Sequence, residues 1–134
     1  MKSFCDTNVV IYAFVVGPNQ ATARARVSES DAISVQVLNE FVNATAKKLK
    51  IPWPEIQQAL ELIDKKFPTP LPLTRDLHRA GMALCRDHRI AFYDALIVAA
   101  AIEAGCDRLF SEDLQHGRRF GDCVIVNPFR ADSL

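Results

Sequence analysis

Short apolar runs, bounded by polar or turn-forming residues, recur along the chain. Residues 3–5, 108–110 and 123–126 have the composition of buried strands, because short apolar runs between turn signals are typical of strands covered on both faces. Residues 32–34 form a similar run, and the proline-rich loop 69–73 ends in apolar residues. The sequence therefore predicts four to five strands.

Longer segments repeat apolar side chains three and four residues apart, which predicts helices. Six helices are expected, at residues 9–16, 21–30, 35–50, 54–66, from 75 onward and at 93–104. Ser34 and Thr74 are suitable N-caps, and Gly105 is a suitable C-terminal stop for the last, alanine-rich helix. The helices at 35–50 and 54–66 are separated by a short link and are expected to form an antiparallel hairpin.

Strands and helices follow one another along the whole chain. This order predicts an α/β fold, a three-layer α/β/α sandwich around a central, mostly parallel sheet. The chain has 134 residues, of which 49% are hydrophobic and 24% charged, as expected for a globular protein. With no repeat or composition change to mark a boundary, a single domain over residues 1–134 is expected.

Net charge and cysteine content restrict the possible functions. The formal net charge is zero, so no overall basic field favours nucleic acid, and any such site must be local. The four cysteines form no C-x-x-C pair, which disfavours a zinc site and fits reduced thiols in the cytoplasm. The start MKSFCDTN lacks the apolar core of a signal peptide, and no apolar run approaches the ~18 residues of a membrane span.

Acidic residues follow the predicted strands where parallel sheets bind their ligands. Asp6 comes directly after strand 3–5, and Asp113 follows strand 108–110 after two residues. Asp94 lies at the start of the alanine-rich helix, whose dipole favours an anion. Because ligands bind at the carboxyl ends of parallel strands, these three acids are expected to converge there. Glu40 lies at the edge of an apolar stripe, where it could reach either water or a cleft.

Each acid also has an ordinary structural explanation when it is considered alone. Asp6 could be a turn residue or a helix cap, and Asp113 could cap the turn that follows it. Asp94 could be a simple N-terminal helix acid, and Glu40 a solvated helix residue. Only the combination of the four acids favours a functional site.

A cluster of carboxylates has a predictable chemistry. Two like charges 4 Å apart repel by about 4 kcal/mol at an effective dielectric near 20, so such a cluster takes up protons or binds a cation. Oxygen donors without histidine or thiolate suit Mg²⁺ or Mn²⁺ rather than Zn²⁺. Such an ion can activate water and stabilise charge on a phosphodiester.

Several segments carry a resemblance to a known family. DTNVVIYA (6–13), LNEF (38–41), FYDALIVAAA (92–101) and LFSEDLQHG (109–117) resemble the PIN domain. They are most similar to the VapC toxins of bacterial toxin–antitoxin pairs. IVNPF (125–129) extends the resemblance over nearly the whole chain, with all segments in order and at fitting distances.

The resemblance implies a magnesium- or manganese-dependent endoribonuclease of the toxin type. The family's catalytic acids correspond to Asp6, Glu40, Asp94 and Asp113. Its metal ligands correspond to Asp6, Asp94 and Asp113, and its polar residues beside the metal to Asn8 and Ser111. Glu112 remains an alternative to Asp113 as the last acid. The resemblance also implies a homodimer and a small antitoxin whose tail crosses the active-site groove.

RNA must still approach an acidic pocket, which requires local contacts. Local basic groups could help, namely Lys47 and Lys48 with Lys50, Lys65 with Lys66, and Arg118 and Arg119 beside His116. The last group is the best candidate for phosphate contacts, although an ordinary solvated loop explains it equally well. Phe92 and Tyr93, which precede Asp94, are candidates for stacking on a base, although core packing is the better explanation of Phe92.

Two other functions remain open. A receiver-type signalling domain also gathers acids and magnesium, but it normally has an acidic pair after its first strand and a lysine near its end. Here Asp6 stands alone and no lysine follows Lys66. The other possibility is a PIN fold that acts only as a binding partner, and the presence of all four acids argues against it.

Overall fold

The computed structural model describes residues 1–130 and contains a four-stranded, mostly parallel sheet. The strands are β1 (Ser3–Cys5), β2 (Arg108–Phe110), β3 (Arg119–Phe120) and β4 (Cys123–Val126), in the order β1-β2-β4-β3. Strands β1, β2 and β4 are parallel, and β3 pairs antiparallel with β4. Residues 131–134, which the single-domain prediction includes, lie outside the described part of the chain.

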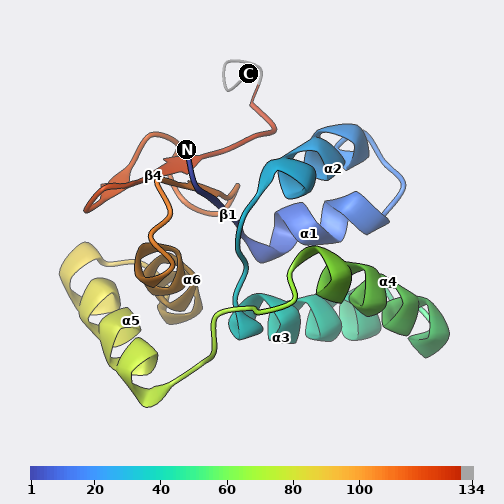
Figure 1. The fold of residues 1–134 in the computed structure, drawn as a ribbon, viewed down its shortest axis with the longest axis horizontal. Coiled ribbons are helices and arrows are strands. Elements are labelled where there is room, and N and C mark those ends of the chain that lie inside the picture. The colour runs from blue at the N-terminus through green and yellow to red at the C-terminus, as the bar shows by residue number, and fades with distance from the viewer. Residues whose placement is uncertain (131–134) are drawn as a thin grey trace.

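Helices flank the sheet in two groups. They are α1 (Thr7–Phe14), α2 (Gln20–Glu29), α3 (Val35–Asn43), the π-helical segment η1 (Ala44–Lys48), α4 (Trp53–Lys66), α5 (Arg75–His88) and α6 (Phe92–Glu103). Figure 1 shows α5 and α6 packed together against the sheet, with α1 to α4 forming a second group beside it. The predicted α/β fold with a mostly parallel central sheet is confirmed.

Two of the predicted strands are much shorter than expected. Residues 32–34 and 69–73 contribute only the single parallel bridges Phe4↔Ala32 and Ser34↔Leu71. Ser34 already caps α3, so the chain leaves the sheet after one or two pairings. Conversely, the two-residue strand β3 was missed, because a pairing this short leaves no periodic pattern in the sequence.

The helix boundaries follow from local chemistry. The hydroxyls of Ser34 and Thr74 accept hydrogen bonds from the backbone amides of Val37 and Leu77, as expected for N-caps. The predicted helix 35–50 ends its α-helical part at Asn43 and continues as η1. Figure 1 shows α4 running back beside α3 in the opposite direction, which is the expected hairpin.

The core is built around α6, whose residues from Ala95 to Ala101 are all buried. Its small side chains allow close packing, and Gly81 of α5 is a point of close approach: a Cβ atom there would lie 2.7 Å from Leu96 Cδ2. Free, buried thiols of Cys5, Cys106 and Cys123 contribute to the same core. None of the helices within residues 1–130 is long and apolar enough to cross a membrane.

Candidate active site

Asp6 is held rigidly between the first strand and the first helix. Its backbone N–H donates to the carbonyl of Phe110 (2.9 Å), which joins the ends of β1 and β2. The side chain, only 3% exposed, accepts hydrogen bonds from Thr7 N at 2.6 Å and from Ser111 Oγ at 2.7 Å. Despite these bonds, the pKa of Asp6 is raised to about 7, mainly by burial and in smaller part by the charges of Asp113 and Glu40.

Ser111 and Asn8 connect Asp6 to Asp113. The Ser111 hydroxyl donates to Asp6 and accepts from the backbone N–H of Asp113 (3.2 Å). The Asn8 amide donates to both carboxylate oxygens of Asp113, at 3.3 and 3.2 Å. These bonds bring together two segments about 105 residues apart in the chain. The two polar residues expected beside the metal thus lie next to the two acids at the carboxyl ends of β1 and β2.

Glu40 points from α3 toward the other acids rather than to open solvent. Its carboxylate accepts hydrogen bonds from Thr7 Oγ1 (3.3 Å) and Gln36 Nε2 (2.9 Å). Partial burial raises the pKa of Glu40, and the charges of Asp94 and Asp113 add to the effect. Thr7 and Gln36 were not singled out from the sequence, although Thr7 follows Asp6 directly and Gln36 lies one helical turn before Glu40.

Asp94 lies in the first turn of α6 and is half-buried. No hydrogen bond to its carboxylate is made by another side chain of residues 1–130. Burial raises its pKa, and the charge of Asp113 raises it further. Asp94 is therefore the acid of the group whose oxygens are least engaged by the protein.

Asp113 is the electrostatic centre of the group, because its charge raises the pKa of Asp6, Glu40 and Asp94. It is also the most exposed of the four, yet partial burial and the charge of Glu112 still raise its own pKa. Lys48, at the end of η1, is a cation that lowers its pKa. Four carboxylates from four separate segments therefore converge on one place and repel one another.

Glu112 is held by a residue outside this group. The Tyr12 hydroxyl donates to Glu112 Oε1 at 2.6 Å, and this bond is the main reason why the pKa of Tyr12 is raised to about 12. The Tyr12 ring packs edge-on against Phe129, with centroids 5.1 Å apart. Asp113, which contacts Asn8, is the better placed of the two neighbouring acids.

The donor atoms of this group suit a divalent cation, but the side chains are not yet positioned around one. Carboxylate, amide and hydroxyl oxygens are the donors that Mg²⁺ and Mn²⁺ prefer, and the mutual repulsion of the four acids favours a cation among them. As they stand, however, no three His, Cys, Asp or Glu side chains of residues 1–130 are arranged to hold a metal ion. Ion binding would therefore require some movement of these carboxylates.

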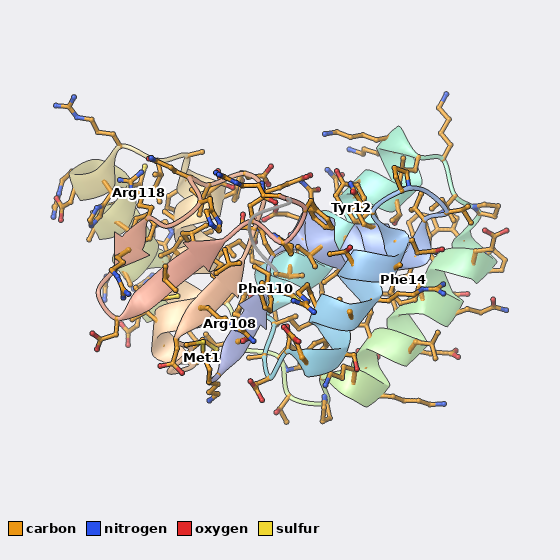
Figure 2. All side chains as sticks on the ribbon, turned by 90° about the horizontal axis from the view of Figure 1, so that it is seen from above. Met1, Tyr12, Phe14, Arg108, Phe110 and Arg118 are labelled. Atoms are coloured by element: carbon orange, nitrogen blue, oxygen red, sulfur yellow. The ribbon has the colours of Figure 1, made fainter. Side chains whose placement is uncertain are left out.

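Among the described residues, the three candidate phosphate contacts make no hydrogen bond or ion pair with the four acids. His116 Nδ1 accepts a hydrogen bond from the backbone N–H of Asn127 (3.0 Å). The Arg118 guanidinium donates to the carbonyl of His88 at 2.8 Å and lies over the Phe120 ring. Arg119 is exposed on β3. Figure 2 shows Arg118 well apart from Tyr12, which is the residue that binds Glu112. Lys48, which belongs to one of the basic groups named from the sequence, is thus the basic residue whose charge acts on Asp113.

The fold and the acidic group together define the class of protein. A family model described as the PIN domain matches residues 3–120, and the chain belongs to the PIN domain family. A search of curated proteins found no match.

Solved structures of toxins share the fold. The VapC20 toxin of Mycobacterium tuberculosis, described as cleaving the sarcin–ricin loop, is 17% identical with a TM-score of 0.68, covering 84% of this chain and 92% of that one. A toxin–antitoxin complex from Klebsiella pneumoniae gives 21% identity and a TM-score of 0.71, over 96% and 98%. VapBC2 from Rickettsia felis, bound to a fragment of promoter DNA, gives 17% and 0.67, over 93% and 97%.

Proposed function

We propose that this protein is a metal-dependent endoribonuclease that hydrolyses RNA phosphodiester bonds and acts as the toxin of a VapBC-type pair. The observation that carries the proposal is the convergence of Asp6, Glu40, Asp94 and Asp113, from four separate segments, at one edge of a PIN fold. Such crowding of like charges is unfavourable without a cation. The likeness to VapC structures supports RNA as the substrate and an antitoxin as the partner.

In this proposal Asp6, Asp94 and Asp113 hold Mg²⁺ or Mn²⁺. When bound, the ion supplies a polarised phosphoryl oxygen and a more acidic water molecule. Ser111 keeps the Asp6 carboxylate oriented through its 2.7 Å hydrogen bond, and Asn8 does the same for Asp113. These hydrogen bonds limit the orientations of the two carboxylates, which must still shift to bring the three acids around an ion.

Glu40 is the proposed general base. Its raised pKa makes its carboxylate a better proton acceptor than an ordinary surface glutamate. Thr7 and Gln36 each donate a hydrogen bond to one of its oxygens, which holds the carboxylate toward the other acids. Glu40 can thus take up the proton of the attacking water while the other three acids hold the ion.

The remaining parts of the proposal concern the cell and the partners. We infer a cytoplasmic protein, a homodimer, and neutralisation by a small antitoxin whose tail occupies the acidic groove. Arg118, Arg119 and His116 remain candidates for contacts with the more distant phosphates of the RNA. Lys48, whose charge lowers the pKa of Asp113, is the candidate for the phosphate beside the cut.

The decisive experiment is cleavage of a mixed RNA pool in the presence of Mg²⁺ or Mn²⁺, with the cut sites mapped. We expect the wild type to cleave, EDTA to stop cleavage, and Asp6→Asn to be inactive while folded. Asp76→Asn is the matched control, because this side chain is 90% exposed on α5. Absence of cleavage by folded wild type across RNA pools would favour a PIN fold that only binds a partner. Full activity of Asp6→Asn would refute the role of the acid.

A further inference from the structure

A surface depression of about 410 Å³ adjoins the acidic group. Four of its lining residues, Gln36, Asn39, Glu40 and Asn43, come from α3, and the fifth is Tyr93 of α6. Glu40 belongs to both the depression and the acidic group, and Tyr93 directly precedes Asp94. Its volume is within the range of natural ligand sites. Because Glu40 and Tyr93 border the acidic group, a ligand bound in the depression would lie next to the scissile phosphate of the proposed reaction.

The lining presents unused hydrogen-bonding groups beside an aromatic face. Asn39 and Asn43 are one helical turn apart, and among residues 1–130 neither side-chain amide has a hydrogen-bond partner. Tyr93 is 62% exposed, although a tyrosine ring is largely apolar. The Phe92 ring contacts it with centroids 5.7 Å apart, which limits the positions that the Tyr93 ring can take. Gln36 differs from the two asparagines, because it is buried and holds Glu40.

We propose that this depression binds one unpaired nucleobase of the RNA next to the scissile phosphate. Tyr93 stacks on the face of the base, and Asn39 and Asn43 donate to and accept from its edge. This inference rests on the proposed ribonuclease function, to which it adds the site that selects the substrate. Such a site would make the enzyme specific for RNA that is single-stranded at the cut, since only an unstacked base exposes both a face and an edge.

The chemistry of the lining favours a base over the other parts of an RNA chain. Within the described residues, the lining has no lysine or arginine and includes the carboxylate of Glu40, so a phosphate would be repelled there. A side-chain amide donates through its NH₂ group and accepts through its oxygen. It can therefore pair with neighbouring acceptor and donor atoms on the edge of a base. A ribose alone would leave the Tyr93 face without a stacking partner.

The first test measures binding of a labelled, unstructured RNA oligonucleotide to the full chain carrying Asp6→Asn, which prevents cleavage. Adding Tyr93→Ala should weaken binding by about 5- to 150-fold, because base–aromatic stacking contributes that much per base. Tyr93→Phe, which keeps the ring, should restore most of the affinity. The salt dependence of binding should stay the same in all three, since no phosphate contact is lost.

Trp53 provides a matched control, as an aromatic side chain that is 60% exposed at the start of α4. Trp53→Ala should leave the affinity unchanged, and a fully paired RNA duplex should bind equally weakly with or without Tyr93→Ala. If the Tyr93→Ala substitution left the affinity for the single strand unchanged, the proposal would be overturned, and an equal loss on Trp53→Ala would also overturn it. The latter result would point to a general effect of exposed aromatic residues.

A second test uses the active enzyme and the mapped cut sites. Asn39→Ala and Asn43→Ala should change which bases flank the cuts, because each removes a hydrogen bond that discriminates between base edges. An unchanged distribution of flanking bases in both variants would overturn the assignment of the two amides. If the wild type neither binds nor cleaves RNA, the proposed function itself fails. Cleavage that does not respond to the Tyr93 and asparagine variants would refute the base site alone.

Discussion

Replacement of Asp6 by asparagine should make the metal-free protein more stable at neutral and alkaline pH. The wild-type carboxyl is buried, and its pKa is raised from 3.8 to about 7, mainly by that burial. Asparagine has nearly the same shape, and its oxygen can still accept from Thr7 N while its amide donates to the Ser111 hydroxyl. The variant therefore keeps the local hydrogen bonds and removes only the charge.

The sign and size of the effect follow from proton linkage. Below about pH 4 the carboxyl is protonated in both the folded and the unfolded chain, so it contributes no penalty. Between about pH 4 and pH 7 only the folded state keeps the proton, so stability is lost as the pH rises toward the folded pKa of Asp6. The difference of about three pKa units corresponds to about 4 kcal/mol, a large part of the roughly 5–15 kcal/mol typical of whole domains.

The assay is urea unfolding in EDTA at several pH values from about 4.5 to about 8.5, on the wild type and on Asp6→Asn. The free energy of unfolding of the variant should exceed that of the wild type by an amount that grows with pH, up to a few kcal/mol. Parallel profiles for the two proteins would refute the reasoning, because they would mean that the Asp6 carboxyl is not destabilised by burial. Asp76→Asn, which changes an exposed acid, should show the wild-type profile.

Three further predictions concern the metal, Lys48 and Gly81. Millimolar Mg²⁺ or Mn²⁺ should raise the melting temperature of the wild type at about pH 8 but not that of Asp6→Asn. Equal increases in the melting temperature of both proteins would exclude Asp6 as a ligand. Lys48→Ala should weaken RNA binding and lower the slope of log affinity against log salt concentration by about 0.7. The pKa of Asp113 should rise because the neighbouring cation is lost. An unchanged slope would exclude a phosphate contact by Lys48. Gly81→Ala should lower the free energy of unfolding by up to about 2 kcal/mol, because its Cβ would lie 2.7 Å from Leu96 Cδ2 and overpacking costs about 1–3 kcal/mol, of which the helix propensity of alanine offsets about 1 kcal/mol. A stability equal to or above wild type would show that the Leu96 side chain moves aside easily.

Repulsion among the four acids lowers folding stability and at the same time favours the binding of positive charge. All four carboxylates have raised pKa values, so the free protein holds this acidic group at the expense of folding stability. A bound cation, or basic residues of an antitoxin, would relieve this repulsion. The same chemistry therefore accounts for the proposed cofactor and for the proposed mode of inhibition, in which a partner covers the groove with positive charge.

Local patterns in the sequence were sufficient for most of the secondary structure. The apolar runs at 3–5, 108–110 and 123–126 are strands, and Ser34 and Thr74 cap helices, because hydrophobic periodicity and capping act over a few residues. The strand predictions failed where pairing depends on distant partners. Residues 32–34 form only isolated bridges, and β3 exists because β4 lies beside it.

The sequence by itself determined which acids follow the strands, and the order of its motifs indicated the PIN family. It could not decide the direction of Glu40 or the different contacts of Glu112 and Asp113. These depend on contacts between residues far apart in the chain, such as Tyr12 with Glu112 and Thr7 with Glu40. Burial and charge are properties of the packed molecule, so the raised pKa values and the depression beside Glu40 appear only when the helices and the sheet are assembled.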